Sequence, residues 1–188
     1  MMTLIAGLVL FLGIHSISIV AAPLRNTLAA KSELGWKALY SLVSIAGFVL
    51  IIQGYSEARI GAEVLYTTPR WLWHVASLFM LPVFVLFIAP YFPGRISAVA
   101  KHPQLVAVKL WALSHLLMNG SVPDVLLFGS FLAWGVIDRI SMKRREQRKL
   151  PGLPKSNIND IIIVVLGLSI YAATVFWAHE RFIGGHLL

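Results

Sequence analysis

Two histidines, His15 and His115, lie inside long apolar runs of the sequence, in "LFLGIHSISIV" and "KLWALSHLLMNG". Ionisable side chains in such runs are rare, and inside a membrane they face the interior of a helix bundle and mark functional sites. Imidazole nitrogens are good axial ligands of haem iron, and bundles present them from facing helices. Taken singly, each histidine is more often a core residue than a ligand. Two in separate segments favour a haem b site held by His15 and His115.

The other histidines lie closer to the ends of the apolar runs. His102 precedes Pro103, and a proline disfavours the helical conformation of the residue before it, so His102 is predicted to be the boundary residue of a helix. It precedes His115 by 13 residues, which in a helix puts the two on roughly opposite faces and about 20 Å apart. These two cannot share one iron. His179 and His186 are expected to be exposed, at or beyond the end of the last helix.

His74 lies in "RWLWHVAS", where it fits either a belt of aromatic residues at the membrane surface or a functional site. His15 is expected near the middle of the membrane, whereas His115 is about one turn from the outer end of its segment. The depth of His74 matches that of His115 at least as well as the depth of His15 does. His74 is therefore a third candidate ligand.

Three further polar residues suit a haem pocket. Asn119 lies four residues after His115, on the same helix face, where its amide can orient the imidazole. Lys109 and Arg25 are cations at the cytoplasmic side that can meet anionic groups such as haem propionates. Snorkelling to the membrane surface, or pairing with Asp138, is the favoured explanation of these two cations.

The composition indicates a membrane protein and limits its chemistry. Of the 188 residues, 58% are hydrophobic and 13% are charged, against about a quarter charged in soluble domains. The chain has no cysteine, which excludes disulfides, iron–sulfur clusters and thiolate haem ligands. The net charge of +8 does not indicate nucleic acid, because the basic residues lie between apolar runs and form no soluble basic surface.

Six segments are apolar enough and long enough to cross a ~30 Å hydrocarbon core, which takes about 20 helical residues. The fourth is the most polar, which suggests a helix packed among the others, and the short turn after it predicts an antiparallel hairpin with the fifth. Haem would be held between the first and the fourth. The sequence predicts an all-α, polytopic membrane bundle in a single domain, 1–188, with spans near 3–22, 37–55, 71–91, 103–119, 122–140 and 159–178.

The basic residues predict the orientation of this bundle. Twelve lysines and arginines lie in the first, third and fifth connections, against three in the second connection and the C-terminal tail. Basic residues accumulate on the cytoplasmic side, so both termini are expected on the outer, periplasmic face of a bacterial inner membrane. The loop "RISMKRREQRKLPGLPK" is then a cytoplasmic charge run that faces lipid headgroups.

Four stretches of the chain closely resemble the NnrU family of bacterial membrane proteins: "GLVLFLGIHS", "ALYSLVSIAGFVLIIQGY", "KHPQLVAVKLWALSHLLMNG" and "LLFGSFLAWGVIDRISMKRR". The resemblance covers nearly the whole chain up to about residue 145. It implies an association with denitrification, in which these proteins are thought to be needed for producing or operating nitrite and nitric oxide reductases.

The NnrU family is similar in turn to 15-cis-zeta-carotene isomerase, an integral membrane haem b protein that changes a polyene double bond from cis to trans. By motif, this resemblance implies haem ligands at His15 of "LGIHS" and His115 of "WALSH". It also implies that the two other histidines of the pattern fall on His74 and His102. The resemblance therefore selects the same pair as burial does.

The leading hypothesis is a haem b membrane protein of NnrU type, acting in denitrification or in a haem-dependent isomerisation of a hydrophobic polyene. Whether the protein is an enzyme stays open, and membrane lipid, a polyene, and a reductase or regulator are the expected partners. A second hypothesis is a haem-free scaffold or assembly factor whose basic loop recruits the reductase. A third is a membrane methyltransferase, for which "KHP" is a weak signal.

Overall fold

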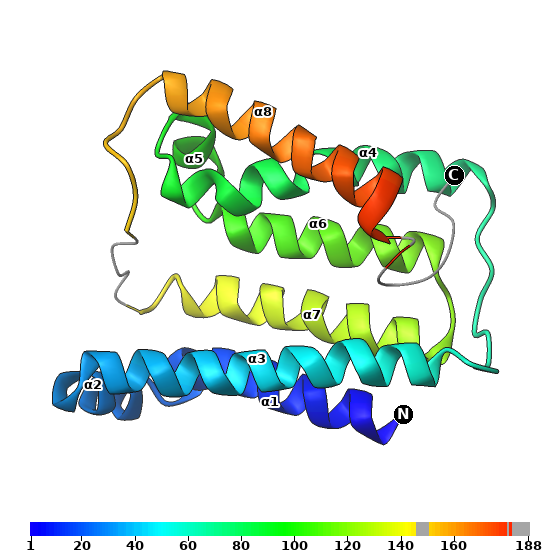
Figure 1. Ribbon diagram of the computed structural model, residues 1–188, viewed down its shortest axis with the longest axis horizontal. Coiled ribbons are helices and arrows are strands. Elements are labelled where there is room, and N and C mark those ends of the chain that lie inside the picture. The colour runs from blue at the N-terminus through cyan, green and yellow to red at the C-terminus, as the bar shows by residue number, and fades with distance from the viewer. Residues whose placement is uncertain (146–150, 180, 182–188) are drawn as a thin grey trace. The chain divides into compact units, whose positions relative to one another are not determined.

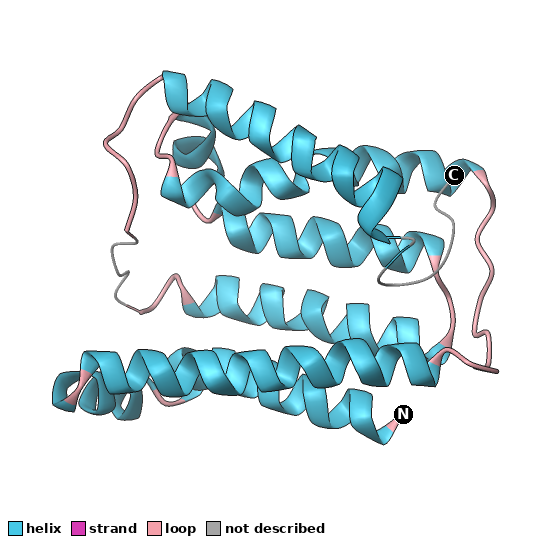
Figure 2. Ribbon diagram, viewed as in Figure 1, coloured by secondary structure: helices cyan, strands magenta, loops and turns pink. Residues whose placement is uncertain are grey.

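The computed structural model describes residues 1–145, 151–179 and 181. These residues form helices joined by loops (Figure 2), with one isolated bridge between Val64 and Ser121 and no β-sheet among them. The predicted all-α class is confirmed. The helices are α1 (Met2–Val20), α2 (Ala22–Lys31), α3 (Glu33–Ala58), α4 (Trp71–Ile88), the 3₁₀ turn η1 (Ala89–Tyr91), α5 (Arg95–Ala100), α6 (Pro103–Met118), α7 (Val122–Ser141), α8 (Ile158–Ala173) and the π-helical turn η2 (Thr174–Ala178), labelled in part in Figure 1.

Four helical stretches in the described residues are long and apolar enough to cross a membrane: α1, α3, Trp71–Tyr91 and Ile158–Ala178. Large apolar side chains cover their outward faces, and Val9, Leu42 and Val165 are each more than half exposed. Such surfaces are stable in contact with lipid chains and are unusual in contact with water. The chain therefore has the features of a membrane protein.

The fourth and fifth predicted spans do form helices, α6 and α7, but these two are not among the four. The α6 helix has 16 residues, or about 24 Å of length at 1.5 Å per residue. The α7 helix contains Asp124, Asp138 and Arg139. The number of six spans and the orientation of the termini therefore stay predictions.

Two helices, α2 and α5, form where the sequence suggested only connecting loops. Pro23 was expected to follow the first span, and α1 does end at Val20, but Pro23 also lies in the first turn of α2. Proline is favoured there because its fixed φ suits a helix start, and the missing N–H has no partner in the first turn anyway. The Ser32 hydroxyl then accepts a hydrogen bond from the backbone N–H of Gly35 at 3.0 Å, so α3 begins at Glu33, earlier than residue 37.

The chain forms two compact units, the first of residues 1–65 and 121–130 and the second of residues 66–120 and 131–188, so that α7 contributes to both. In the first unit α1 packs along α3 through glycines (Figure 1). A Cβ atom on Gly7 would lie 2.6 Å from the backbone N of Ile51, and one on Gly47 would lie 2.7 Å from that of Phe11. Glycine is required at both positions because the two backbones approach so closely.

In the second unit α4 packs against α6 and α8. The backbones of α4 and α8 meet at Gly167, where a Cβ atom would lie 2.6 Å from the N of Val85. Fully buried Ala76 on α4, and Ala107 and Ala112 on α6, supply small side chains to the core of this unit. Hydrogen bonds at both ends of α4 show that α4 and α6 run antiparallel: the residues after α6's last turn bond to Tyr66, before α4, and Gln104 of α6 bonds to Tyr91, after α4.

The first turn of α8 ties down the segment that follows α4. The Asp160 carboxylate accepts hydrogen bonds from the backbone N–H groups of Arg95 at 2.9 Å and Ile96 at 3.1 Å, the first residues of α5. The Asn159 amide donates to the carbonyl oxygens of Pro93 at 2.8 Å and Pro154 at 3.0 Å. These two adjacent polar residues therefore hold the turn around residues 93–96 against the start of α8.

Candidate functional site

His15 is held by its own helix. Its Nδ1 lies 2.6 Å from the carbonyl oxygen of Phe11, one turn earlier in α1. Because a carbonyl oxygen only accepts, Nδ1 carries the proton, and Nε2 then carries the lone pair of the ring. The Phe11 and His15 rings stack, with centroids 4.2 Å apart and planes inclined by 27°. The imidazole is thus fixed in tautomer and orientation.

The neighbouring helix α3 supports this arrangement from the other side. The Tyr40 ring lies 5.0 Å from the His15 ring, and Phe48 lies 6.3 Å from Phe11, measured between centroids. Gly47, on the same helix, is the residue that admits the backbone of Phe11. Phe11, whose carbonyl accepts the hydrogen bond of His15, is therefore itself positioned by α3.

His115 repeats the local geometry of His15 in the second unit. Its Nδ1 donates to the carbonyl oxygen of Trp111, one turn earlier in α6, at 2.9 Å. The Trp111 and His115 ring centroids are 5.3 Å apart. The Trp111 ring also meets Phe131 of α7 edge-on, at 5.3 Å and 85°. An aromatic residue four positions before the histidine thus supplies both the backbone acceptor and a ring contact at both sites.

Asn119 does not have the predicted role. Its side-chain amide donates to the backbone carbonyl of His115 at 3.1 Å, and its backbone N–H donates to the same oxygen at 2.8 Å. Asn119 is the residue that ends α6, where the last carbonyls need donors. The acceptor that the structure gives to the imidazole N–H is Trp111, so Asn119 caps the helix.

Tyr66, which nothing in the sequence singled out, also holds this end of α6. Its hydroxyl lies 2.6 Å from the carbonyl oxygen of Leu116 and 2.9 Å from that of Asn119. Nothing local in "VLYTTP" signals this role, because the partners are about fifty residues further along the chain. The last turn of α6, which carries His115, is therefore anchored by the loop before α4.

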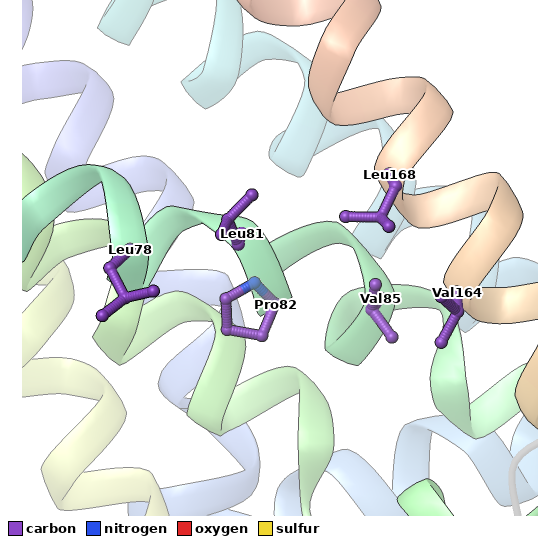
Figure 3. A pocket seen from close by; sticks show the side chains of 6 residues that line it. All are labelled: Leu78, Leu81, Pro82, Val85, Val164 and Leu168. Atoms are coloured by element: carbon purple, nitrogen blue, oxygen red, sulfur yellow. The ribbon is translucent and has the colours of Figure 1, made fainter.

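The third candidate, His74, lies in the first turn of α4 and is exposed. Because α4 and α6 are antiparallel, His74 and His115 lie at the same end of the second unit, as their predicted depths require. His74 also precedes Leu78 by one turn, and Leu78 begins an open apolar groove. The groove has a volume of about 450 Å³ and is lined by Leu78, Leu81, Pro82 and Val85 of α4 and by Val164 and Leu168 of α8 (Figure 3).

Neither candidate cation pairs with Asp138, which was one of the suggested partners. Asp138, suggested as a partner for both, instead binds Arg145, with Nη2 and Oδ1 2.6 Å apart. The alkyl chain of Lys109 packs over Gly135, on which a Cβ atom would lie 3.1 Å from Lys109 Cγ. Arg25 donates to the Asn26 side chain at 3.3 Å.

The remaining histidines divide between confirmed and wrong predictions. His102 is the residue before α6, as predicted, and it is half-buried. Burial, and next the nearby Arg139 guanidinium, lower the pKa of His102 below its ordinary value. His179 was expected to be exposed but is half-buried, with its Nδ1 shielded from solvent, because it continues the helical turn η2. His186 lies outside the described residues.

A second polar cluster, not predicted from the sequence, lies at the start of α7. Asp124 forms one half of a capping box with Ser121: its carboxylate accepts from the backbone N–H of Ser121 at 2.9 Å, and it also accepts from the Ser121 hydroxyl at 2.5 Å. The Tyr55 hydroxyl of α3 donates to the other carboxylate oxygen at 2.5 Å. The "SVPD" spacing is the signal that could have indicated this cap. Its role is structural, since each oxygen of the buried carboxylate has a partner.

The donor set can be tested for a metal centre. Across residues 1–145, 151–179 and 181, no three histidine, aspartate or glutamate side chains gather closely enough to hold a metal ion. Haem has four ring nitrogens of its own and needs only one or two axial ligands from the protein. Each of the two imidazoles, with Nδ1 bound to a backbone carbonyl, has the kind of hydrogen bond that orients metal-binding histidines.

A family model described as NnrU protein matches residues 3–186. The chain therefore belongs to the NnrU family. No curated protein and no solved structure matches it.

Proposed function

We propose that this NnrU protein binds haem b in the membrane, with His15 and His115 as its axial ligands. The observation that carries the proposal is the shared geometry of the two histidines. Each donates Nδ1–H to the carbonyl of an aromatic residue one turn earlier, which leaves the Nε2 lone pair directed away from its own backbone. Both histidines also lie in apolar helices, where ionisable side chains are rare and mark functional sites.

The side chains around each histidine suit the same role. Phe11 and Tyr40 surround His15, and Trp111 contacts His115. Aromatic surroundings exclude water from an iron ligand and limit the motion of the imidazole. The proposal assigns Lys109 and Arg25 to the haem propionates. Haem held by His15 and His115 would supply one-electron redox chemistry.

We place this activity in denitrification, as the family resemblance implies, in a multi-pass protein of the bacterial inner membrane. The proposed topology has six spans and both termini on the outer side, with α6 and α7 as the fourth and fifth spans. The apolar groove on α4 and α8 is open at the surface of two membrane-spanning stretches, so we assign membrane lipid to it. An isomerase-like reaction would use the same groove for a polyene chain.

The absorption spectrum of the detergent-purified full chain, expressed with adequate haem, tests the proposal. We expect a Soret band that shifts on reduction, with the low-spin form typical of two imidazole ligands. His15→Ala and His115→Ala should each give a high-spin spectrum, and the double variant should lose the band. His179→Ala is the matched control, since it removes a half-buried histidine of the same chain. Colourless protein, or unchanged spectra in both single variants, would show that the assignment is wrong.

A second candidate function, a haem-free scaffold for a reductase, is favoured by the exposed cations Lys143 and Arg144 beyond α7. Deletion of residues 142–156 distinguishes the two functions. The scaffold is supported if the intact protein is colourless and the deletion variant no longer binds its partner. Retention of the Soret band after the deletion supports the haem protein.

A further inference from the structure

One end of the second unit, at the start of α6 and the end of α7, is strongly basic. The contacts of Trp111 with Phe131 and of Lys109 with Gly135 pair the two helices in opposite directions. The start of α6 therefore lies beside the end of α7, and the electrostatic influence of Arg139 and Arg145 on His102 agrees. We call this surface the basic face; it consists of Lys101, His102, Arg139, Lys143, Arg144 and Arg145.

A buried ion pair organises the basic face. Asp138 is only 6% exposed, and Arg145 folds back to bind it at 2.6 Å. A carboxylate so deeply buried is stable only with a close cation. The pairing satisfies Asp138, the acid that faces His102 from α7, and leaves the rest of the face positive.

Arg139 is the residue on this face that most needs a partner. It is half-buried, and it forms no hydrogen bond or ion pair with any residue in the described ranges. Lys101, Lys143 and Arg144 are exposed around it. A guanidinium has five donors in a planar fork that matches the oxygens of a phosphate. The face is thus complementary to a phosphate group.

The apolar side chains beside Arg139 identify the kind of phosphate. Val136, Ile137 and Ile140 of α7 are 45%, 54% and 51% exposed. Val136 lies one turn before Arg139 on the same side of α7, and Ile140 and Ile137 continue the exposed apolar strip from Val136 around the helix. A free phosphate ion has no apolar part to contact this strip, whereas the acyl chains of a phospholipid can cover it.

We propose that the basic face binds the headgroup of an anionic phospholipid, with the phosphate on Arg139 and the acyl chains along Val136, Ile137 and Ile140. The same face lies at the side of the protein predicted to be cytoplasmic, where anionic lipids attract basic residues. This site is separate from the proposed haem ligands and does not depend on them.

His102 makes this binding sensitive to pH. Burial is the main reason that its pKa is lowered, with Arg139, Arg145 and Lys101 adding to the effect and Asp138 opposing it. A bound anion stabilises the protonated ring, so binding is accompanied by proton uptake at His102. Affinity should therefore rise as the pH falls from 7.5 to 5.5, around the ordinary histidine pKa of about 6.5.

Native mass spectrometry of the detergent-purified full chain tests the proposal, with phosphatidylglycerol and phosphatidylcholine added in equal amounts. We expect preferential retention of phosphatidylglycerol. Arg139→Gln should weaken that retention by about tenfold, because it removes the charge-assisted hydrogen bonds to the phosphate. Arg70→Gln is the matched control and should change little. It removes an exposed cation just before α4, at the end of the second unit opposite the basic face. Circular dichroism and size-exclusion chromatography check that each variant folds.

Two further measurements complete the test. His102→Gln should retain phosphatidylglycerol with no dependence on pH between 5.5 and 7.5. Millimolar inorganic phosphate should fail to displace the lipid. Equal retention of the two lipids, equal effects of Arg139→Gln and Arg70→Gln, or displacement by inorganic phosphate would each overturn the proposal. The first of these outcomes would instead favour an acidic protein as the partner of the basic face.

Discussion

His15 and His115 have the same local geometry but are supported in different ways. At both, the carbonyl of an aromatic residue four positions earlier accepts a hydrogen bond from Nδ1, and the ring of that residue contacts the imidazole. His15 is then supported by another helix, through Tyr40 and the close approach at Gly47. His115 lies in a last turn that Asn119 and Tyr66 cap.

The comparison separates what a helix does by itself from what its neighbours add. At both histidines the acceptor carbonyl belongs to the same helix, so the orientation of the ring is largely a local property. The precision of that orientation depends on the packing of the surrounding elements. Substitutions should therefore affect the two histidines through different residues.

Gly47→Val should disturb the first site most strongly. The added side chain collides with the backbone of Phe11, and overpacking of this kind destabilises by about 1–3 kcal/mol. We expect a lower midpoint of thermal unfolding in detergent. The Soret band should also shift toward that of the His15→Ala variant. Gly13→Val is the matched control, because no atom of the described structure, beyond its own helix, lies within 4 Å of a Cβ built there. Equal damage from both variants would contradict the role of close helix approach.

Trp111→Leu tests the ring contact at the second site apart from the backbone acceptor. The variant keeps the carbonyl that binds His115 but loses the edge-on contact with Phe131, which should cost about 1–2 kcal/mol. We expect a lower unfolding temperature with haem content retained. Trp71→Leu, at a 62% exposed position, should have little effect. Loss of haem in Trp111→Leu would mean that the ring, and not the carbonyl, controls the imidazole.

Tyr66→Phe should loosen the second site alone. Removing the hydroxyl leaves the carbonyls of Leu116 and Asn119 without this donor and should destabilise by about 1 kcal/mol. Hydrogen exchange should become faster in the last turn of α6 and stay unchanged in α1. Tyr171→Phe serves as the control, since no hydrogen bond of that hydroxyl is found within the described residues. Unchanged exchange in α6 would show that Asn119 is a sufficient cap.

The pH dependence at His102 should be the smallest effect. Its pKa is lowered in the folded protein, so the unfolded chain binds the proton more readily. The stabilisation from the neutral ring is fully present above pH about 6.5 and is lost as the pH falls through the folded pKa. Thermal unfolding between pH 5 and 8, without added lipid, should show a shallow decline on the acidic side that His102→Gln removes. The decline is shallow because His102 is only half-buried.

Hydropathy was sufficient to predict the helices that carry both histidines, since α1 and α6 begin and end within two residues of the expected segments. The boundary at His102 was also predictable, because Pro103 acts on the residue directly before it. These features depend on residues near in sequence. The same is true of the cap at Ser121 and Asp124, whose spacing is visible in "SVPD".

The missed features depend on residues distant in sequence. Tyr66 reaches carbonyls fifty residues or more away, and the partner of Asp138 was decided by how Arg145 folds back over the end of α7. The role of Asn119 was mistaken because the i+4 spacing brings it near His115 without saying whether it meets the ring or the backbone. Helical periodicity gives proximity, whereas the choice of hydrogen-bond partner depends on the three-dimensional arrangement.

The hydrogen bonds of Asp160 have a consequence for how the protein is made. Its carboxylate binds the backbone of Arg95, 65 residues earlier in the chain. At a synthesis rate of about 5–20 residues per second, that carboxylate leaves the ribosome about 3–13 s after its partner. The turn around residues 93–96 must therefore wait in the inserting chain, with its N–H groups bound to water or lipid headgroups, until α8 has been translated. The last apolar helix thus completes a part of the fold that was synthesised in the middle of the chain.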